Sequence, residues 1–433
     1  MTPAARTAAM IELAAKIAGG DRPADTVVSG YVRSHRYMGS KDRRAVTDGV
    51  FALLRHHARL GWWLERTGWP EDAARGRVAA FLRLVEGLPA DEVAALFSGE
   101  GHGPAALSDA ERACLDALPA AIDDAPDMPA AVRLECPDWA ADLVDTPDEL
   151  AALLAPAPTD LRVNERVASR SDVLHRLRSD GIKATATPYS PLGIRLADRV
   201  PLAGHKLFKA GAVEVQDEGS QIVALMTDAQ PGMQVADFCA GAGGKSLVLA
   251  ARMAGRGRVV ACDISEQRLA QARERMKRAR LDNIEPHLLA DERDRWVARQ
   301  KGKFDRVLVD APCSGTGAWR RNPDARWRGV DLAALTDLQD RILGAASRLV
   351  KPGGWLVYAT CSLLDAENRQ RIDRFLTSHP DFNPLPAENI APRILDQHLV
   401  FEGPWLRLSP LHTFTDGFFL AILERRSDLS NEP

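Results

Sequence analysis

The sequence predicts an α/β protein in three parts: an all-helical domain over residues 1–145, a linker with a small α/β module over 146–215, and a doubly wound domain over 216–428. Two observations support this division. From residue 216 to about residue 425, apolar strand-like runs alternate with helical patterns, as in a mostly parallel sheet covered by helices. Before about residue 140, the apolar residues follow helical spacing.

Length and composition indicate an ordinary globular protein. Its 433 residues are 45% hydrophobic and 27% charged, and no run approaches the roughly 18 apolar residues of a spanning helix. Glu12 and Lys16 interrupt the apolar N-terminus, so a signal peptide is not expected and the protein is expected to be cytoplasmic. The cysteines form no CxxC pair, which argues against a zinc site or a disulfide framework; they are Cys114, Cys136, Cys239, Cys262, Cys313 and Cys361.

Charge is divided unevenly along the chain. Residues 1–87 hold 14 Lys and Arg against 9 Asp and Glu, residues 88–160 hold 2 against 16, and residues 161–433 hold 40 against 34. The two basic ends favour a polyanionic partner such as RNA, whereas the acidic middle is typical of a solvated surface or spacer.

The N-terminal region is predicted to be helical from Ala8 to Ala18 and again from Asp42 to Leu60, with Ser40 as the N-cap of the second helix. Between them, Tyr31–Tyr37 interleaves basic and aromatic side chains, a pattern compatible with RNA binding or with a solvated loop. Three tryptophans that follow are expected in the core: Trp62, Trp63 and Trp69. Through Asp42–Val46 and Leu53–Arg55 the region resembles the helical RNA-binding module of the antitermination factor NusB.

Residues 88–160 contain several prolines, which favours short helices and a linker. Beyond them, Leu161–Asn164 is predicted as a strand, Ser171–Asp180 as a capped helix and Ile182–Thr187 as a second strand. This arginine-rich module is interpreted either as an RNA-binding element or as a structural adaptor.

A glycine-rich loop follows the first strand of the doubly wound domain, Gln234–Phe238. Glycines allow the backbone to turn sharply and to approach a ligand closely. Neither common phosphate motif fits, because Cys239 stands where a P-loop needs its first glycine and Ser246 stands where the dinucleotide fingerprint needs its last. The loop residues are Cys239, Ala240, Gly241, Ala242, Gly243, Gly244 and Lys245.

Acidic residues end the strands that come next. Asp263 follows the strand Arg258–Cys262, where a carboxylate can accept hydrogen bonds from ribose hydroxyls, and Asp291 follows Ile284–Leu289 at the expected rim of an adenine pocket. Two later strands run into Asp310–Ala311–Pro312–Cys313 and into Thr360–Cys361–Ser362. In a doubly wound sheet these two strands are expected to be neighbours, so both thiols should face one pocket.

Taken together, these motifs resemble the Nop/Sun family of S-adenosylmethionine-dependent RNA cytosine-5 methyltransferases, and the NusB-like front end resembles its bacterial ribosomal RNA branch. The stretches that match are Gln216–Gln221, Asp237–Lys245, Asp310–Gly317 and Thr360–Ser362. The resemblance implies a Rossmann-like methyltransferase domain, S-adenosyl-L-methionine as cofactor, Arg268 as a further cofactor-pocket residue and ribosomal RNA as partner. Separately, we expect a monomer that needs no metal. The family usually has Ala-Pro where this chain has Gly241-Ala242, which removes a proline's stiffness from the loop.

The chemistry explains the need for a thiol. Carbon 5 of cytosine is a poor nucleophile, and addition of a thiolate to carbon 6 activates it. The residues alone do not rank the two cysteines, because DNA cytosine methyltransferases use a Pro-Cys like Pro312-Cys313. The resemblance implies Cys361 as the nucleophile and Cys313 as the residue that assists product release, with Asp310 contacting the base or cofactor and Lys245 beside it.

Four arginines and two tryptophans follow the Pro-Cys loop, over residues 318–328. They suit phosphate contact and base stacking next to the pocket, or alternatively a surface loop anchored by packed indoles. A different class of function, an RNA-binding ribosome assembly factor with a vestigial pocket, is disfavoured by the presence of Cys313, Cys361 and Asp310.

Overall fold

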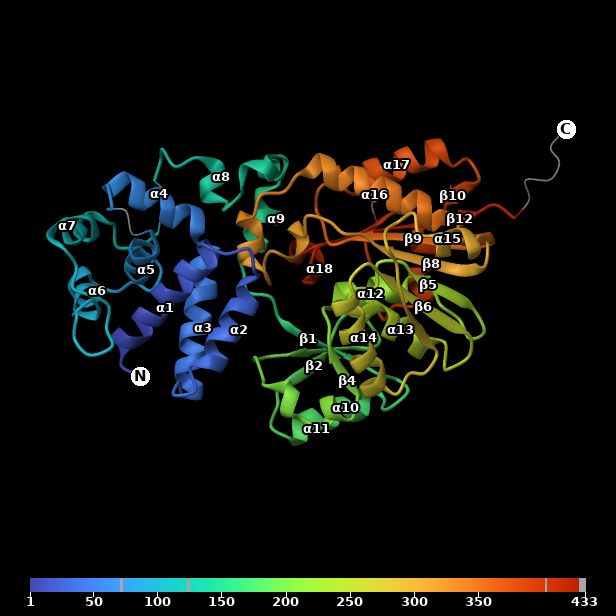
Figure 1. The fold of residues 1–433 in the computed structure, drawn as a ribbon, viewed down its shortest axis with the longest axis horizontal. Helices are drawn as coiled ribbons and strands as arrows, with labels where there is room; N and C mark the ends of the chain where they lie inside the picture. Colours follow the sequence, from blue (N-terminus) through green and yellow to red (C-terminus); the bar gives the residue numbers. More distant parts are fainter. Residues whose placement is uncertain (71–72, 123–124, 402, 428–433) are drawn as a thin grey trace. The chain divides into compact units, whose positions relative to one another are not determined.

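The computed structural model describes residues 1–70, 73–122, 125–401 and 403–427 and divides the chain into two compact units (Figure 1). The first unit comprises Met1–Ala155 together with a distant segment, Trp319–Gly329. The second comprises Pro156–Ala318 and Val330–Pro433. Within the described ranges, no helix is both long enough and apolar enough to cross a membrane.

The first unit is helical around one apolar core, as the spacing predicts. Its core includes Leu13, Val46, Leu60 and Phe81, and Trp63 and Trp69 pack against it as expected. The helices are α1 (Pro3–Ala18), α2 (Ala24–Ser34), α3 (Ser40–Arg55), α4 (His57–Thr67), α5 (Ala73–Leu84), α6 (Ala90–Leu96), α7 (Asp109–Ala117), α8 (Ala130–Arg133), η1 (Asp138–Asp145), α9 (Pro147–Ala152) and η4 (Pro323–Trp327).

The predicted single helix Asp42–Leu60 is wrong, because the helix breaks at His56 and restarts as α4. The carboxylate of Glu135, which is fully buried, accepts hydrogen bonds from the backbone N–H groups of Ala58 at 2.7 Å and Arg59 at 3.2 Å. The first N–H groups of a helix have no hydrogen-bond partners within the helix. Here a side chain distant in sequence accepts hydrogen bonds from two of them. The predicted N-cap is also shifted by one residue, since Gly39 precedes the first turn of α3.

The segment Trp319–Gly329 belongs to the helical unit, and its tryptophans pack inside that unit. Trp319 is 1% exposed, lies edge-on to Trp139 with ring centroids 5.7 Å apart, and carries the Arg326 guanidinium 4.6 Å from its centroid. Trp327 stacks on His57 at 4.7 Å. Burial excludes base stacking by Trp319, for which the alternative of a packed indole holds. Trp327 is half-buried, and base stacking by its ring stays a prediction.

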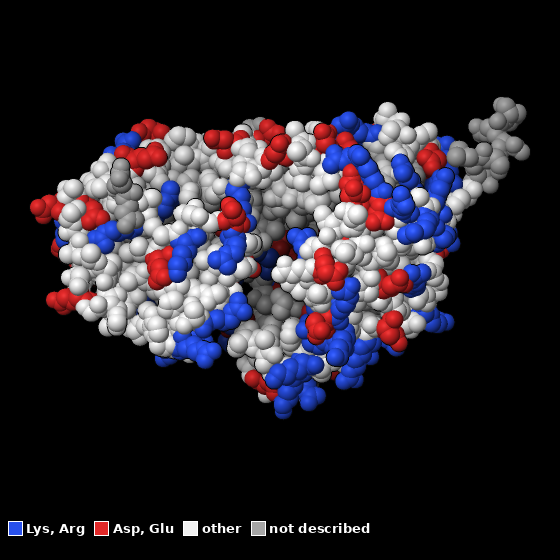
Figure 2. Space-filling view, viewed as in Figure 1, with Lys and Arg blue, Asp and Glu red and all other residues white. Residues whose placement is uncertain are grey.

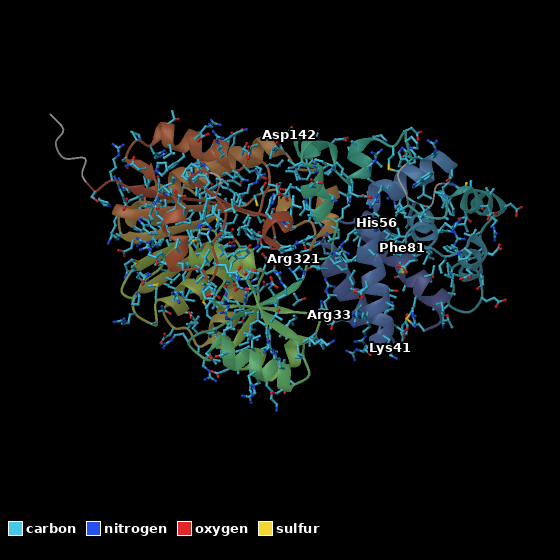
Figure 3. All side chains as sticks on the ribbon, turned by 180° about the vertical axis from the view of Figure 1, so that it is seen from behind. Arg33, Lys41, His56, Phe81, Asp142 and Arg321 are labelled. Carbon is cyan, nitrogen blue, oxygen red and sulfur yellow. The ribbon has the colours of Figure 1, made fainter. Side chains whose placement is uncertain are left out.

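The basic and aromatic stretch after α2 is divided between core and surface. Tyr31 is buried and donates a hydrogen bond from its hydroxyl to Glu12 at 2.9 Å, whereas Tyr37 is 71% exposed. Arg33 and Lys41 are exposed and project from the same end of the unit, away from His56 and Phe81 (Figure 3). RNA contact by this end remains a prediction.

The second unit begins with a small antiparallel sheet in the order β2-β3-β1-β4. The predicted helix starts one residue early, at Arg170, because the hydroxyl of Ser169 accepts the Asp172 N–H at 3.1 Å and caps it. Exposed basic side chains cover this module and the neighbouring α14 at the lower edge of Figure 2. The elements are β1 (Thr159–Val163), α10 (Arg170–Ser179), β2 (Ala184–Ala186), β3 (Gly193–Leu196), η2 (Leu202–Gly204), α11 (Lys206–Lys209) and β4 (Val213–Val215).

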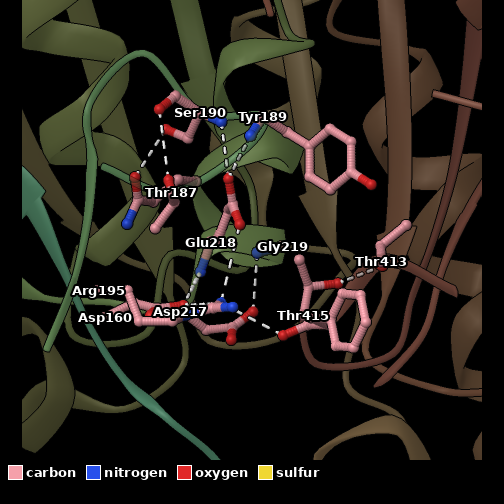
Figure 4. Close-up of polar contacts among 12 residues, drawn as sticks. Asp160, Thr187, Tyr189, Ser190, Arg195, Asp217, Glu218, Gly219, Thr413 and Thr415 are labelled. Atoms are coloured by element: carbon pink, nitrogen blue, oxygen red, sulfur yellow. Dashed lines mark hydrogen bonds and ion pairs between the residues drawn. The ribbon is translucent and has the colours of Figure 1, made fainter. Parts of the chain in front are cut away.

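Buried carboxylates fasten this module to the rest of the unit (Figure 4). Glu218 accepts the N–H groups of Tyr189 at 2.7 Å and Ser190 at 2.8 Å. Asp160, on β1, accepts the backbone N–H of Glu218 at 3.2 Å and is itself held by both arms of the Arg195 guanidinium of β3 at 2.8 Å, a strong bidentate pair within the small sheet. The contacts of Glu218 and Asp160 fix the orientation of the small sheet relative to the helix that starts at Glu218.

The main sheet has the order β10-β12-β9-β8-β5-β6-β7, with β11 paired to β12. Strands β5 to β9 are parallel, and β10, β11 and β12 add antiparallel pairs at one side. The strands are β5 (Gln234–Asp237), β6 (Arg258–Asp263), β7 (Ile284–Leu288), β8 (Phe304–Asp310), β9 (Val350–Thr360), β10 (Phe382–Pro384), β11 (Leu406–Leu408) and β12 (Phe418–Arg425).

Helices cover both faces of the main sheet, which confirms the doubly wound prediction (Figure 1). Helices α12, α13 and α14 share one core with alternate residues of the strands, and α15, α16 and α17 share the other. Their bounds are α12 (Glu218–Leu225), α13 (Gly244–Arg252), α14 (Glu266–Ala279), α15 (Arg295–Arg299), η3 (Thr316–Ala318), α16 (Leu332–Ser347), α17 (Arg369–Ser378), η5 (Ala387–Asn389), η6 (Ala391–Arg393) and α18 (Pro410–Thr413).

Candidate active site

A pocket of about 460 Å³ lies at the carboxyl ends of β5, β6 and β8. This is where a doubly wound sheet binds its ligands, and the volume suits a small organic molecule. Its wall contains most of the residues that the sequence singled out: Cys239, Ala240, Gly241, Ala242, Gly244, Lys245, Asp263, Arg268, Asp291 and Asp310.

The glycine loop turns the chain from β5 into α13 through two left-handed residues, Gly241 with φ +55° and Gly243 with φ +76°. At Gly243 a side chain would also lack space, because a Cβ atom there would lie 3.0 Å from the Cβ of Ala272 on α14. Glycine is therefore required at this position, where it lets the loop and α14 approach each other. Gly243 itself is buried at the start of α13.

Asp263 joins the end of β6 to the glycine loop. One carboxylate oxygen accepts the Gly241 N–H at 2.8 Å and the other accepts the Ser265 N–H at 2.8 Å. Each carboxylate oxygen has two acceptor positions, so both can still receive a ligand hydroxyl. Arg268 and Asp291 lie on the same pocket wall and are exposed.

Asp237, the last residue of β5, is a buried acid that lines the pocket. Its Oδ2 accepts the Ser246 hydroxyl at 2.6 Å, while its Oδ1 is buried without a partner among the described residues. Burial raises the pKa of Asp237 to about 7, more than the Ser246 hydrogen bond lowers it.

Lys245, in the first turn of α13, forms an ion pair with Asp310 at the end of β8, with Nζ and Oδ2 2.6 Å apart. The lysine side chain is 10% exposed and the aspartate side chain 30% exposed. Burial lowers the pKa of Lys245, but the charge of Asp310 more than offsets this and raises the pKa overall; Asp237 and Cys361 act in the same direction. The site therefore holds a permanent ammonium group.

The two thiols predicted to share one pocket are in contact, since Cys313 Sγ and Cys361 Sγ lie 3.3 Å apart. Their strands are neighbours as expected, with Asp310 of β8 opposite Ala359 of β9. The hydrogen bond to Cys361 and burial both raise the pKa of Cys313 well above its usual range. Among the described residues, the pocket wall includes Asp310 and Pro312, the residue directly before Cys313, but neither Cys313 nor Cys361.

Several site residues were not found from the sequence. Ile264, 70% exposed directly after Asp263, lines the pocket with Leu289, Leu338 and Ile342. Its position after the strand-end acid is a signal that could have identified it. Glu367, which contacts both cysteine-bearing loops, offered no such signal, because an acid just before a helix usually caps it.

Two family models match the chain. The model for 16S rRNA methyltransferase RsmB/F matches residues 224–424, and that for the ferredoxin-like domain of RsmF/B-like methyltransferases matches residues 138–203. Among solved structures, a methyltransferase homologue from Pyrococcus horikoshii is 27% identical with a TM-score of 0.58, covering 68% of this chain and 97% of that one.

Relatives in curated collections agree with these matches. A protein of Synechocystis sp. named "Probable ribosomal RNA small subunit methyltransferase B" is 31% identical over 436 residues, covering 94% of this chain and 96% of the relative. A Bacillus subtilis protein of the same name is 35% identical over 276 residues, covering 63% of this chain and 61% of the relative. The chain spans about half the length of several other curated relatives it matches. The chain belongs to the RsmB/F family of rRNA methyltransferases.

Proposed function

We propose that this protein transfers a methyl group from S-adenosyl-L-methionine to carbon 5 of a cytidine in RNA, most naturally small-subunit ribosomal RNA given its family. The observation that carries the proposal is the pair of thiols in contact at 3.3 Å beside a pocket of cofactor size. Methylation at carbon 5 needs a nucleophile at carbon 6 and a second group near carbon 5, which are adjacent atoms of one ring.

The pocket suits S-adenosylmethionine in charge and size. The cofactor carries a sulfonium and an ammonium, and the wall supplies acidic side chains, including the Asp237 Oδ1 that lacks a partner in the described structure. Asp263 retains acceptor positions for ribose hydroxyls, and Ile264 and Leu289 offer apolar surface to an adenine ring. When bound, the cofactor supplies an electrophilic methyl group.

The surroundings of the two sulfurs support Cys361 as the nucleophile. The Lys245 ammonium lies close enough to Cys361 for the two groups to interact. The hydrogen bond to Cys361 and burial raise the pKa of Cys313, so Cys313 can donate the hydrogen bond that joins the two sulfurs. This assignment of donor and acceptor agrees with the family resemblance.

The proposed reaction has two stages. The Cys361 sulfur adds to carbon 6 of the cytosine, and the electron pair of the ring double bond then takes the methyl group at carbon 5. The bond between that methyl group and its sulfonium sulfur would break, and S-adenosylhomocysteine would leave with the electron pair. Loss of the carbon 5 proton to a base restores the double bond as the carbon–sulfur bond breaks, which returns the thiolate. We assign assistance of this second stage to Cys313, whose sulfur lies 3.3 Å from that of Cys361. The target base must leave any stack to reach the two thiols.

Separate replacement of the two cysteines tests the proposal. Cys361→Ala is expected to abolish methyl transfer from labelled S-adenosylmethionine to ribosomal RNA, whereas Cys313→Ala is expected to accumulate a covalent protein–RNA adduct that survives denaturing electrophoresis. Cys114→Ala, in the helical unit, is the matched control and should behave as wild type.

Two outcomes would overturn the assignment. Full activity of Cys361→Ala would exclude it as the nucleophile, and an adduct in Cys361→Ala that is absent from Cys313→Ala would exchange the two roles. Mapping of 5-methylcytidine in RNA from cells with and without the gene would identify the modified position.

A further inference from the structure

A buried glutamate lies between the two cysteine-bearing loops. Glu367 is 0% exposed and its carboxylate accepts hydrogen bonds from both loops. Its Oε1 accepts the backbone N–H of Ser314 at 2.8 Å, and its Oε2 accepts the hydroxyls of Ser314 and Ser362. Each of these serines directly follows one of the two cysteines. One carboxylate therefore holds the residue next to each sulfur.

Helix α16 contributes to the same arrangement through Gln339. Its Nε2 donates to Glu367 Oε1 at 3.0 Å and to the backbone oxygen of Pro312 at 3.0 Å, the residue before Cys313. The Pro312–Ser314 loop is thus held on both sides of its cysteine. We refer to Glu367, Gln339, Ser314 and Ser362 as the Glu367 network.

The backbone that carries Glu367 is itself fixed. The hydroxyl of Tyr358, on β9, donates to the carbonyl oxygen of Glu367 at 2.7 Å. The neighbouring Asn368 donates from Nδ2 to the Ser362 carbonyl at 2.9 Å and accepts from the Thr360 hydroxyl at 2.5 Å. The carboxylate is consequently anchored to the strand from which the Cys361 loop emerges, and it reaches across to the loop of the neighbouring strand.

The network has the properties of a positioning device. An ionised carboxylate only accepts hydrogen bonds, and all the groups aimed at this one are donors. Such bonds to a charged group inside a protein are short and strong. Two thiols that must act on neighbouring atoms of one ring tolerate little displacement, since a shift of about 1 Å can cost about 100-fold in rate.

We propose that Glu367 is a positioning residue that keeps the Cys313 sulfur against the Cys361 sulfur, so that the second thiol lies at carbon 5 when the first is bonded to carbon 6. This role rests on the proposed function. It predicts that loss of the carboxylate impairs release of the methylated RNA more than binding of either substrate.

The test compares Glu367→Ala and Glu367→Gln with wild type. Glu367→Ala should bind S-adenosylmethionine with unchanged affinity, lower kcat by about 100-fold at similar KM, and accumulate the covalent RNA adduct as Cys313→Ala does. Glu367→Gln should recover part of the rate, because its remaining oxygen can accept from the two serine hydroxyls. Glu218→Gln is the matched control, a buried acid that accepts instead from Tyr189 and Ser190, and it should trap no adduct.

A second measurement does not depend on activity or on folding of the alanine variant. With diamide as oxidant, Cys313 and Cys361 of wild type should form a disulfide rapidly, each thiol losing one hydrogen to the diamide, because their sulfurs already touch. In Glu367→Gln the disulfide, measured by mass spectrometry, should form more slowly.

The outcomes separate the two proposals. Suppose that Cys313→Ala accumulates the covalent adduct, whereas Glu367→Ala methylates RNA at the wild-type rate and accumulates no adduct. The positioning role of Glu367 is then wrong and the proposed function stands. Disulfide formation at the wild-type rate in Glu367→Gln would equally reject it. If neither cysteine variant behaves as described, the proposed function itself fails.

Discussion

The buried acid at the end of β5 makes a quantitative prediction about pH. Burial raises the pKa of Asp237 from 3.8 to about 7, so the folded protein holds a proton there that the unfolded chain releases from about pH 4 upward. The contribution of Asp237 to the free energy of unfolding should therefore be largest at low pH and fall as pH rises to about 7. Three pKa units at about 1.4 kcal/mol each give a loss of about 4 kcal/mol.

Asp237→Asn removes this titration and keeps the side-chain shape, since the amide oxygen can still accept the Ser246 hydroxyl. The stability of the variant relative to wild type should rise by about 4 kcal/mol between about pH 4 and pH 8. Urea denaturation across this range measures the difference, and hydrogen exchange of the β5 amides assigns it to this strand.

Asp305→Asn provides a control with the opposite sign. Burial raises the pKa of Asp305, but Lys351 and the Gln234 N–H lower it more, so the pKa is depressed overall. The ionised Asp305 stabilises the folded protein at neutral pH, and this contribution disappears as pH falls. Asp305→Asn should therefore have a lower free energy of unfolding than wild type only at the higher pH. If the free energies of unfolding of Asp237→Asn and wild type changed by the same amount between about pH 4 and pH 8, the raised pKa of Asp237 would be refuted.

Three further predictions concern the site and the helical unit. Asp310→Asn should cost about 3 kcal/mol of unfolding free energy in urea because it leaves the buried Lys245 ammonium unpaired, and adding Lys245→Met should restore most of it. Gly243→Ala should cost at least about 1–2 kcal/mol and weaken S-adenosylmethionine binding, measured by calorimetry, because of its positive φ and the 3.0 Å approach to Ala272. Trp319→Ala should destabilise the helical unit by about 3–5 kcal/mol, with cofactor affinity unchanged; a selective loss of RNA binding at wild-type stability would contradict its packing role.

Strand periodicity located the residues that line the pocket because the relevant side chains follow directly from their strands. Asp263 and Asp310 terminate apolar runs, and parallel strands bring such ends to one edge of the sheet. The contact between the two thiols followed from the same rule, once the order of β8 and β9 was inferred.

Features that depend on distant partners could not be predicted in this way. The break after Arg55 is explained by Glu135, about eighty residues further along the chain. The role of Trp319 was misjudged because an indole beside arginines suits base stacking and internal packing equally, and composition does not distinguish them. Glu367 was overlooked because one of its partners, Ser314, lies 53 residues away.

The segment Trp319–Gly329 has a consequence for synthesis of the protein. The helical unit is encoded in two pieces, and the whole of Pro156–Ala318 is translated between them. At about 5–20 residues per second, the ribosome needs on the order of ten seconds to bridge that gap. During this interval the indole of Trp139 has no ring contact with Trp319, and the backbone carbonyl of Glu135 receives no hydrogen bond from the Arg326 guanidinium. The nascent helical unit should therefore reach full protease resistance only after the Pro-Cys loop has left the ribosome, although its helices come first.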